Sequence, residues 1–135
     1  MNSFVRLGFI PPGYDLGLLV LRVCFGFSLF WCHGLPKITG FSHMAEHFPN
    51  PLHLGMQTTL LLAIFAESVC VLLVIIGLGT RWAALIIAID VGSAFAFVHK
   101  FHLTGPGSSE PAYAYLVVML VLFITGAGKY SVDRK

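Results

Sequence analysis

Three ionisable residues lie inside long apolar runs of this chain and limit what it can fold into. Arg22, Glu67 and Asp90 each sit near the middle of a run long enough to cross a bilayer. A charged residue at the centre of a membrane-spanning helix costs about 2.5–3.5 kcal/mol. That cost falls when the helices bundle and the three groups point inward at one another. We therefore take Arg22, Glu67 and Asp90 as a candidate buried polar and proton-exchanging site.

The composition identifies the class of protein. Hydrophobic residues make up 57% of the 135 residues and charged residues only 10%, with a mean hydropathy of +0.86. Soluble domains carry about 25% charged residues, so the chain is predicted to be an integral membrane protein in contact with the lipid bilayer. The net charge of +2 includes no Lys/Arg cluster, which gives no sign of nucleic-acid binding. The length is that of a single domain, residues 1–135.

The apolar runs divide the chain into four predicted membrane-spanning helices. Asp15 is a plausible helix N-cap, and Gly34 and Pro36 are expected to end or kink the first span. A tight turn at residues 77–81 makes the second and third spans an antiparallel hairpin. The predicted fold class is an all-α integral membrane protein, an antiparallel four-helix transmembrane bundle. Its spans lie at about 15–35, 57–78, 81–99 and 110–128, with an outer loop over 36–56.

Basic residues are distributed unequally between the two predicted ends of the bundle. Four spans place both termini on one side of the membrane, and that side carries most of the Lys and Arg. The positive-inside rule then predicts a multi-pass protein of a bacterial-type inner (plasma) membrane with both termini cytoplasmic. The cytoplasmic set is Arg6, Arg81, Lys129, Arg134 and Lys135, and the opposite set is Lys37 and Lys100.

The first span carries its polar residues on one stripe, which is therefore predicted to face the other helices. Arg22 lies on this stripe and has a long side chain, so an Arg22–Glu67 or Arg22–Asp90 pair is geometrically feasible. One arginine cannot neutralise two carboxylates, and a second negative charge is strongly disfavoured in a low dielectric. Glu67 and Asp90 are therefore predicted to share a proton at neutral pH. The alternative is that the three groups only hold the bundle together.

All six histidines map to the predicted outer side. His43 and His47 are four residues apart, a spacing that metal sites use on helices. The sequence offers no second strong ligand motif, so these two are weak metal candidates, and an interfacial or solvated role is favoured. His33 differs because it shares the stripe of Arg22 at the mouth of the bundle, where a proton-exchanging role is expected.

Three segments of the chain resemble the DoxX family of small four-span membrane proteins. They are LRVCFGFSLFWCHGLPKITGF with Arg22, His33, Gly34 and Lys37, AESVCVLLVIIGLGTRWAAL with Glu67, and the C-terminal GAGKYSVDRK. With Glu110 opening the fourth span, they cover most of the chain from residue 15 onward. The C-terminal motif reads GAG where the family pattern tends toward GPG. The resemblance implies a four-helix membrane bundle and a link to redox chemistry, since relatives look like the membrane subunit of a thiosulfate:quinone oxidoreductase.

The resemblance and the polar residues together favour a quinone-interacting or redox-associated membrane subunit. Arg22 and His33 would hydrogen-bond a quinone oxygen, and Glu67 or Asp90 would relay the proton. The sequence carries no flavin, haem or iron–sulfur motif, so electron transfer needs a quinone or a soluble oxidoreductase partner. Whether this chain is itself an enzyme or a non-catalytic subunit stays open. The remaining candidate ligand-binding residues are Lys37, Glu110, Phe30 and Trp31.

Two other functions stay open. One is a membrane scaffold that anchors a soluble oxidoreductase. The other is a small proton-coupled transporter, whose size class commonly forms homo-oligomers, although the spans show no inverted internal repeat.

The shared proton is a first testable prediction. Difference infrared spectroscopy of the carboxyl bands at pH 6 should show one of Glu67 and Asp90 protonated, because one nearby cation balances only one carboxylate. The signal should disappear in the Glu67→Gln, Asp90→Asn double variant. Two ionised carboxylates at pH 6 would contradict the prediction.

Overall fold

The computed structural model of the chain describes residues 13–50, 52–98, 100–105 and 109–133, which form helices joined by turns and loops. These ranges contain no strand. Arg6, His99, Arg134 and Lys135 lie outside them. The helices are α1 (Tyr14–Leu29), η1 (Phe30–Gly34), α2 (Leu35–Thr39), α3 (Phe41–Met44), α4 (Met56–Ile64), η2 (Phe65–Cys70), α5 (Val71–Ile76), α6 (Thr80–Ser93), η3 (Ala94–Val98) and α7 (Glu110–Thr125), where η marks a π-helical turn.

Within the described residues, three continuous helical runs are long and apolar enough to cross a membrane. They are Tyr14–Thr39, Met56–Ile76 and Thr80–Val98, of 26, 21 and 19 residues. The chain is thus a multi-pass membrane protein. The fourth apolar helix, α7, has 16 residues and spans roughly 24 Å at 1.5 Å per residue, less than the hydrocarbon thickness of about 30 Å.

The first helical run is longer than the sequence predicts. Gly34 and Pro36 were expected to stop or kink the helix near residue 35, but it continues to Thr39. A proline is tolerated here because it lies in the first turn of α2, immediately after the π-helical turn. The helix begins at Tyr14 with Gly13 as N-cap, and Asp15 lies in the first turn without capping it. The connection that follows is correspondingly shorter and contains the four-residue helix α3.

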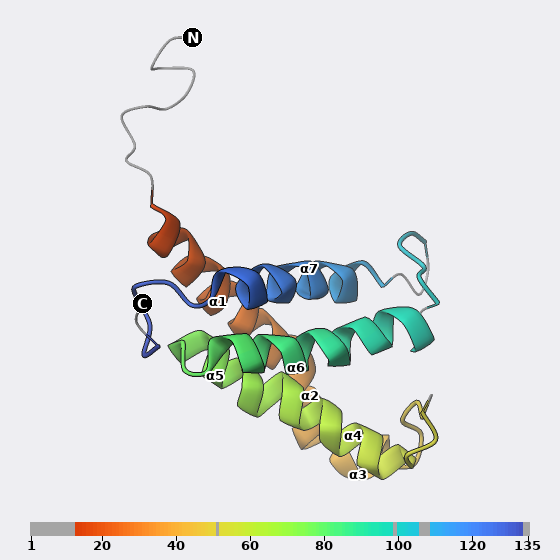
Figure 1. Ribbon diagram of the computed structural model, residues 1–135. Coiled ribbons are helices and arrows are strands. Elements are labelled where there is room, and N and C mark those ends of the chain that lie inside the picture. The colour runs from red at the N-terminus through yellow and green to blue at the C-terminus, as the bar shows by residue number, and fades with distance from the viewer. Residues whose placement is uncertain (1–12, 51, 99, 106–108, 134–135) are drawn as a thin grey trace.

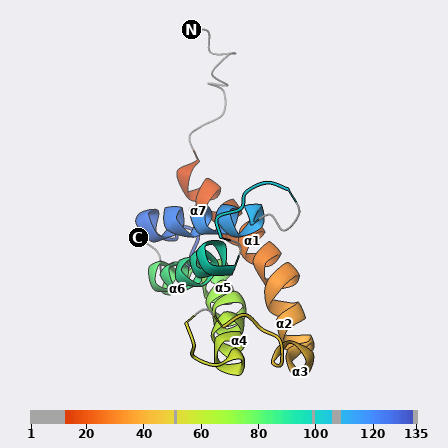
Figure 2. The same ribbon diagram turned by 90° about the vertical axis from the view of Figure 1, so that its right-hand side faces the viewer.

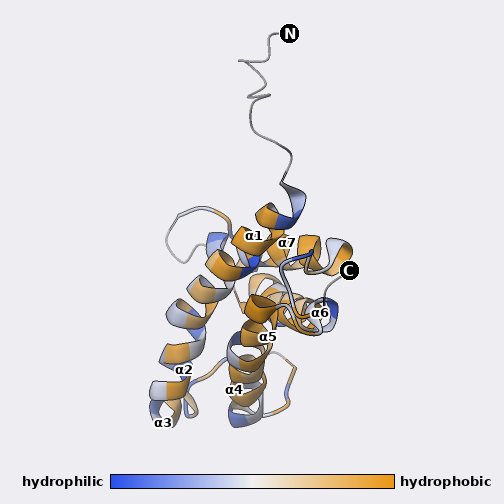
Figure 3. Cartoon of the chain, turned by 90° about the vertical axis from the view of Figure 1, so that its left-hand side faces the viewer, coloured by the Kyte–Doolittle hydropathy of each residue, from blue (hydrophilic) through white to orange (hydrophobic). Residues whose placement is uncertain are grey.

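The helices diverge from one end of the molecule to the other (Figure 1). At one end, the α5–α6 turn, the start of α1 and the segment after α7 lie together. At the other end, α2, α3 and α4 diverge from α6 and α7 (Figures 1 and 2). We call the first the tail end and the second the loop end. Most of the ribbon in the helices is coloured orange for apolar residues (Figure 3), and many large apolar side chains are exposed, as expected of helices that face lipid.

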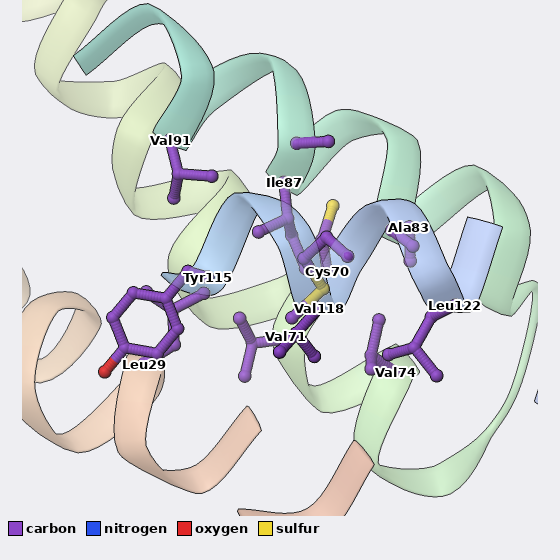
Figure 4. Packing of buried hydrophobic residues seen from close by; sticks show 13 residues of the cluster. Leu29, Cys70, Val71, Val74, Ala83, Ile87, Val91, Tyr115, Val118 and Leu122 are labelled. Carbon is purple, nitrogen blue, oxygen red and sulfur yellow. The ribbon is translucent and has the colours of Figure 1, made fainter. Parts of the chain in front are cut away.

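The core is formed by side chains of α1, η2, α5, α6 and α7, and Figure 4 shows them packed against one another. Leu29, Val74 and Ile87 are at most 1% exposed there. Small residues permit close packing: a Cβ on Gly26 would lie 2.6 Å from Ile75 Cγ1. The remaining core members are Cys70, Val71, Ala83, Ala84, Ala88, Val91, Tyr115, Val118, Met119 and Leu122.

The segment after α7 crosses the tail end and is hydrogen-bonded to three helices. Val132 N and Asp133 N donate to Ile76 O and Gly77 O, at 3.2 and 2.8 Å. The Asp133 carboxylate accepts hydrogen bonds from Gly79 N at 2.8 Å and Thr80 N at 2.9 Å. It thereby caps the N-terminus of α6, where Gly79 itself has a left-handed φ of 58°.

The close approach of η1 to η2 depends on a glycine. A Cβ on Gly34 would overlap the carbonyl oxygen of Glu67 and lie 3.0 Å from Ser68 Oγ. Backbone atoms cannot yield as a flexible side chain can, so Gly34→Ala should lower the free energy of unfolding by about 1–3 kcal/mol. Thermal unfolding in detergent measures this. Gly17→Ala is the matched control, since nothing lies within 4 Å of its Cβ, and it should be neutral or slightly stabilising. Equal stability of the two variants would contradict the packing described.

The Asp133 cap predicts a pH-dependent stability. Partial burial alone would raise the pKa of Asp133, but hydrogen bonds from the Thr80 and Gly79 backbone and the charge of Arg22 outweigh it, so the pKa lies below its ordinary value. A carboxyl with a lowered folded-state pKa stabilises the fold above its unfolded pKa of about 3.9, and the effect disappears as the pH falls through the folded-state pKa.

Asp133→Ala should therefore cost about 1 kcal/mol at pH 7, the usual value of a helix cap. The difference from wild type should shrink below about pH 4. Glu46→Ala, which removes an exposed carboxylate at the loop end, is the control and should change little. If Asp133→Ala lowered the free energy of unfolding by the same amount at pH 7 and pH 3, the charged cap would be excluded as the cause.

Candidate functional site

A cavity of about 330 Å³ lies at the loop end between the diverging helices. Its wall is mainly apolar, with a small number of polar side chains, as is typical of small-molecule sites. The polar members include His33, Lys37, Glu67, Asp90 and Tyr115, which come from five different elements. The remaining lining residues are Leu29, Phe48, Pro49, Thr59, Ala63, Val91, Ser93, Ala94, Val98, Ser109, Pro111 and Ala112.

Lys37 and Glu67 form an ion pair in the wall of the cavity. Lys37 Nζ donates a hydrogen bond to Glu67 Oε2, and the two side chains are only 15% and 8% exposed. Lys37 reaches this position because the first helix continues past Pro36 into α2. A pair so far from bulk water is screened little and must be compensated locally.

Asp90 is the second carboxyl of the site. From α6, its side chain lies within hydrogen-bonding reach of Glu67 and close enough to interact electrostatically with Lys37. A hydrogen bond between two carboxyls requires a proton on one of them. With one proton on the two carboxyls, the charges of Lys37, Glu67 and Asp90 sum to zero. The structure therefore brings together two of the three residues predicted as the buried polar site.

The third predicted residue, Arg22, lies elsewhere. Its side chain is fully buried, and its guanidinium donates to Val74 O at 3.3 Å, to Ile75 O at 2.8 Å and to Tyr130 O. The expected Arg22–Glu67 or Arg22–Asp90 pair is not formed. Arg22 instead reaches two carbonyls at the C-terminal end of α5, where a cation also complements the helix dipole. Its role is to join α1 to α5 and to the C-terminal segment.

His33 and Tyr115 form the aromatic side of the cavity. Their rings meet edge to face with centroids 5.6 Å apart, and Tyr115 Oη lies 2.7 Å from Ser28 Oγ. His33 is half-buried and interacts electrostatically with both Glu67 and Lys37. Tyr115 is not singled out by the sequence, because the fourth span carries no charged residue after Glu110. A tyrosine facing the core needs a partner for its hydroxyl, and Ser28 is that partner.

Three further predicted ligand-binding residues do not line the cavity. Trp31 is 58% exposed and stacks on Phe27 at 5.8 Å on the outer surface of the helix. Phe30 packs partly buried against the core. Glu110 is exposed in the first turn of α7. Consecutive residues of a helix point about 100° apart, so Phe30, Trp31 and His33 cannot all face the same cavity.

The two weak metal candidates lie side by side on the surface. His43 and His47 are exposed, with ring centroids 5.7 Å apart, and His47 Nδ1 lies 3.4 Å from His43 O. Among the described residues, no group of three or more His, Cys, Asp or Glu side chains is arranged to hold a metal ion.

The three π-helical turns all contribute residues to the cavity wall. His33 comes from η1, Glu67 from η2, and Ala94 and Val98 from η3. A π-helical turn inserts one extra residue into an α-helix and occurs frequently at functional sites. Here η1 and η2 contact one another through Gly34, which lies directly against the Glu67 backbone. The turns therefore fix the direction in which Glu67 and His33 point.

The chain is similar to known proteins over most of its length. The family model described as DoxX matches residues 17–100. An uncharacterized protein of Haemophilus influenzae is 30% identical over 128 residues, covering 90% of this chain and 83% of that protein. No solved structure matches the chain.

Proposed function

Since this chain belongs to the DoxX family, we propose that it is a redox-associated membrane subunit whose cavity binds a quinone head group. The observation that supports this most is the Lys37–Glu67–Asp90 cluster, placed in an otherwise apolar cavity between membrane helices. The cavity volume of about 330 Å³ lies at the lower end of the usual range for small-molecule pockets, about 300–1,000 Å³. The ring of a quinone is apolar and its two oxygens accept hydrogen bonds, which matches this lining.

Each polar residue has a distinct role in this proposal. Lys37 and His33 are the donors that face the cavity, and the Lys37 ammonium stabilises negative charge that develops on a ligand oxygen. The Glu67–Asp90 pair holds and releases a proton. Full reduction of a quinone takes up two electrons and two protons. The electrons come from a soluble oxidoreductase partner, because the sequence carries no redox cofactor motif.

The membrane arrangement that we propose is a four-span bundle. In it α7 is the fourth span, antiparallel to α6, and the tail end faces the cytoplasm of a bacterial-type inner membrane. The Lys and Arg of the tail end support this orientation. Since α7 is short, the bilayer must thin locally or the helix must pack deeply against its neighbours. α6 and α7 lie side by side in both views (Figures 1 and 2).

The two alternative functions, scaffold and transporter, require different structural features. A scaffold needs docking surface for a soluble partner. The backbone of residues 129–133 and the Asp133 carboxylate are hydrogen-bonded to α1, α6 and the end of α5, and the side chains of Tyr130 and Val132 are exposed there. A proton-coupled transporter would use the same carboxyl pair and should move a solute in proteoliposomes when a proton gradient is applied. Absence of flux together with quinone binding would select the redox subunit.

Binding of a short-chain quinone to the protein in nanodiscs tests the proposal directly. Lys37→Met should weaken binding about tenfold or more, because a hydrogen bond to a charged donor is worth about 1.5 kcal/mol or more. Lys129→Met is the matched control: it removes the same charge at the tail end, where Lys129 is exposed. Thermal unfolding of both variants checks that they fold. Absence of wild-type binding, or equal weakening by the two variants, would contradict the proposal.

A further inference from the structure

Two separate hollows open at opposite ends of the molecule. The first is the cavity around Glu67 and Asp90 at the loop end. The second, of about 470 Å³, lies at the tail end and includes Asp15, Thr80 and Asp133 in its lining. The two share no lining residue. Any path for protons through the protein must therefore cross the layer between them.

That layer is apolar and closely packed. It is formed by side chains of α1, α5, α6 and α7 that are at most 1% exposed (Figure 4). We call this set the apolar layer: Leu29, Val71, Val74, Ile87, Met119 and Leu122. None of these side chains can donate a hydrogen bond, and among them only the Met119 sulfur is even a weak acceptor, so the layer offers no chain along which a proton could move.

The thickness of the layer follows from the helix geometry. Seven residues separate Glu67 from Val74, whose carbonyl accepts from Arg22, and this is roughly 10 Å at 1.5 Å per residue. Ten residues separate Asp90 from Thr80, or roughly 15 Å. A hydrogen bond spans about 3 Å, so either gap requires several linked waters, which an apolar packed core does not hold.

Unlike the apolar layer, the rim of the cavity at the loop end contains polar residues. Its rim contains Phe48 and Pro49 from the connection after α3, Thr59 from the first turns of α4, and Ser109 at the start of α7. Ser109 Oγ donates to His102 O at 2.5 Å. The cavity wall toward the loop end thus carries the hydroxyl groups of Thr59, Ser93 and Ser109, in contrast to the apolar layer.

From these observations we infer that the Glu67–Asp90 pair exchanges protons with the loop side of the membrane only. The titratable and charged groups that face the pair are Lys37 from α2, His33 from η1, Tyr115 from α7 and Cys70 from η2. All of them lie on the cavity side of the apolar layer or at its edge. The inference rests on the proposed proton exchange at this pair and is independent of which ligand the cavity binds.

The consequence is directional. Any ligand that takes up protons at this site draws them from the loop side, and any ligand that loses protons releases them there. With the tail end cytoplasmic, as proposed above, reduction of a quinone in the cavity by electrons from the oxidoreductase partner takes its two protons from outside the cell. Turnover in that direction therefore lowers the proton concentration on the outer side of the membrane.

Cysteine accessibility in oriented vesicles tests the sidedness. The three native cysteines, Cys24, Cys32 and Cys70, are first replaced by alanine. Single cysteines are then placed in the cavity wall with Ala63→Cys or Ser93→Cys, in the apolar layer with Val74→Cys, and in the tail hollow with Thr125→Cys. A membrane-impermeant cationic methanethiosulfonate is added from one side at a time, and labelling is read by mass spectrometry.

We expect both cavity variants to be labelled from the loop side only, Thr125→Cys from the tail side only, and Val74→Cys from neither. Labelling of either cavity variant from the tail side, or of neither variant from any side, would overturn the inference. Size-exclusion profiles exclude misfolded variants, and the two cavity positions are independent. Quinone binding is not measured here, so failure of this test and failure of the proposed function are distinguishable.

Discussion

The placement of one ammonium group against two carboxyls in an apolar cavity is the interaction on which the loop end depends. Lys37 reaches Glu67 only because the first helix runs on through α2, and Glu67 takes its position from the contact of η2 with Gly34. Asp90 then completes the cluster from α6. Each group would be strongly unfavourable alone in this environment, and together with one proton they are neutral. The cluster therefore fixes the spacing of three helices that otherwise diverge.

The two ends of the molecule solve the same problem of buried charge in different ways. At the tail end, the two terminal nitrogens of the Arg22 guanidinium donate to backbone carbonyls, and the Asp133 carboxylate accepts from backbone N–H groups. Helix ends provide most of these backbone groups, and the opposite charges of Arg22 and Asp133 add to them. At the loop end, charged side chains face one another and a cavity. Groups tied to backbone hold the fold together, whereas groups that face a cavity remain available to a ligand or a proton.

Much of the architecture could be predicted from the sequence, and the errors have identifiable causes. The helical class, the membrane character and the DoxX family are confirmed, because apolar runs of about 20 residues permit few other structures. Glu67 and Asp90 do lie together, as expected of ionisable groups near the middle of two apolar runs joined in a hairpin. Arg22 was grouped with them for the same reason, but its long side chain reaches backbone carbonyls at the end of α5 instead.

The position of Lys37 shows a second kind of limit. Gly34 and Pro36 are helix-ending signals in most contexts, and a helix that stops at residue 35 leaves Lys37 in a loop. The π-helical turn η1 has no recognisable signal in the sequence, although it decides which residues face the cavity. Tyr115 was missed for a related reason: an aromatic residue in an uncharged apolar helix looks like packing until its hydroxyl partner, Ser28, is known.

The π-helical turns also separate the molecule into halves that can vary independently. One extra residue in a helix rotates everything beyond it by about 100° relative to the part before it. In η1, η2 and η3 this rotation is confined to the boundary between the packed core and the cavity. A single-residue insertion or deletion at such a turn would change the direction in which the cavity residues point. The packing of the helices at the tail end would stay the same. Related chains of slightly different length could thus present different groups to the cavity on an unchanged core.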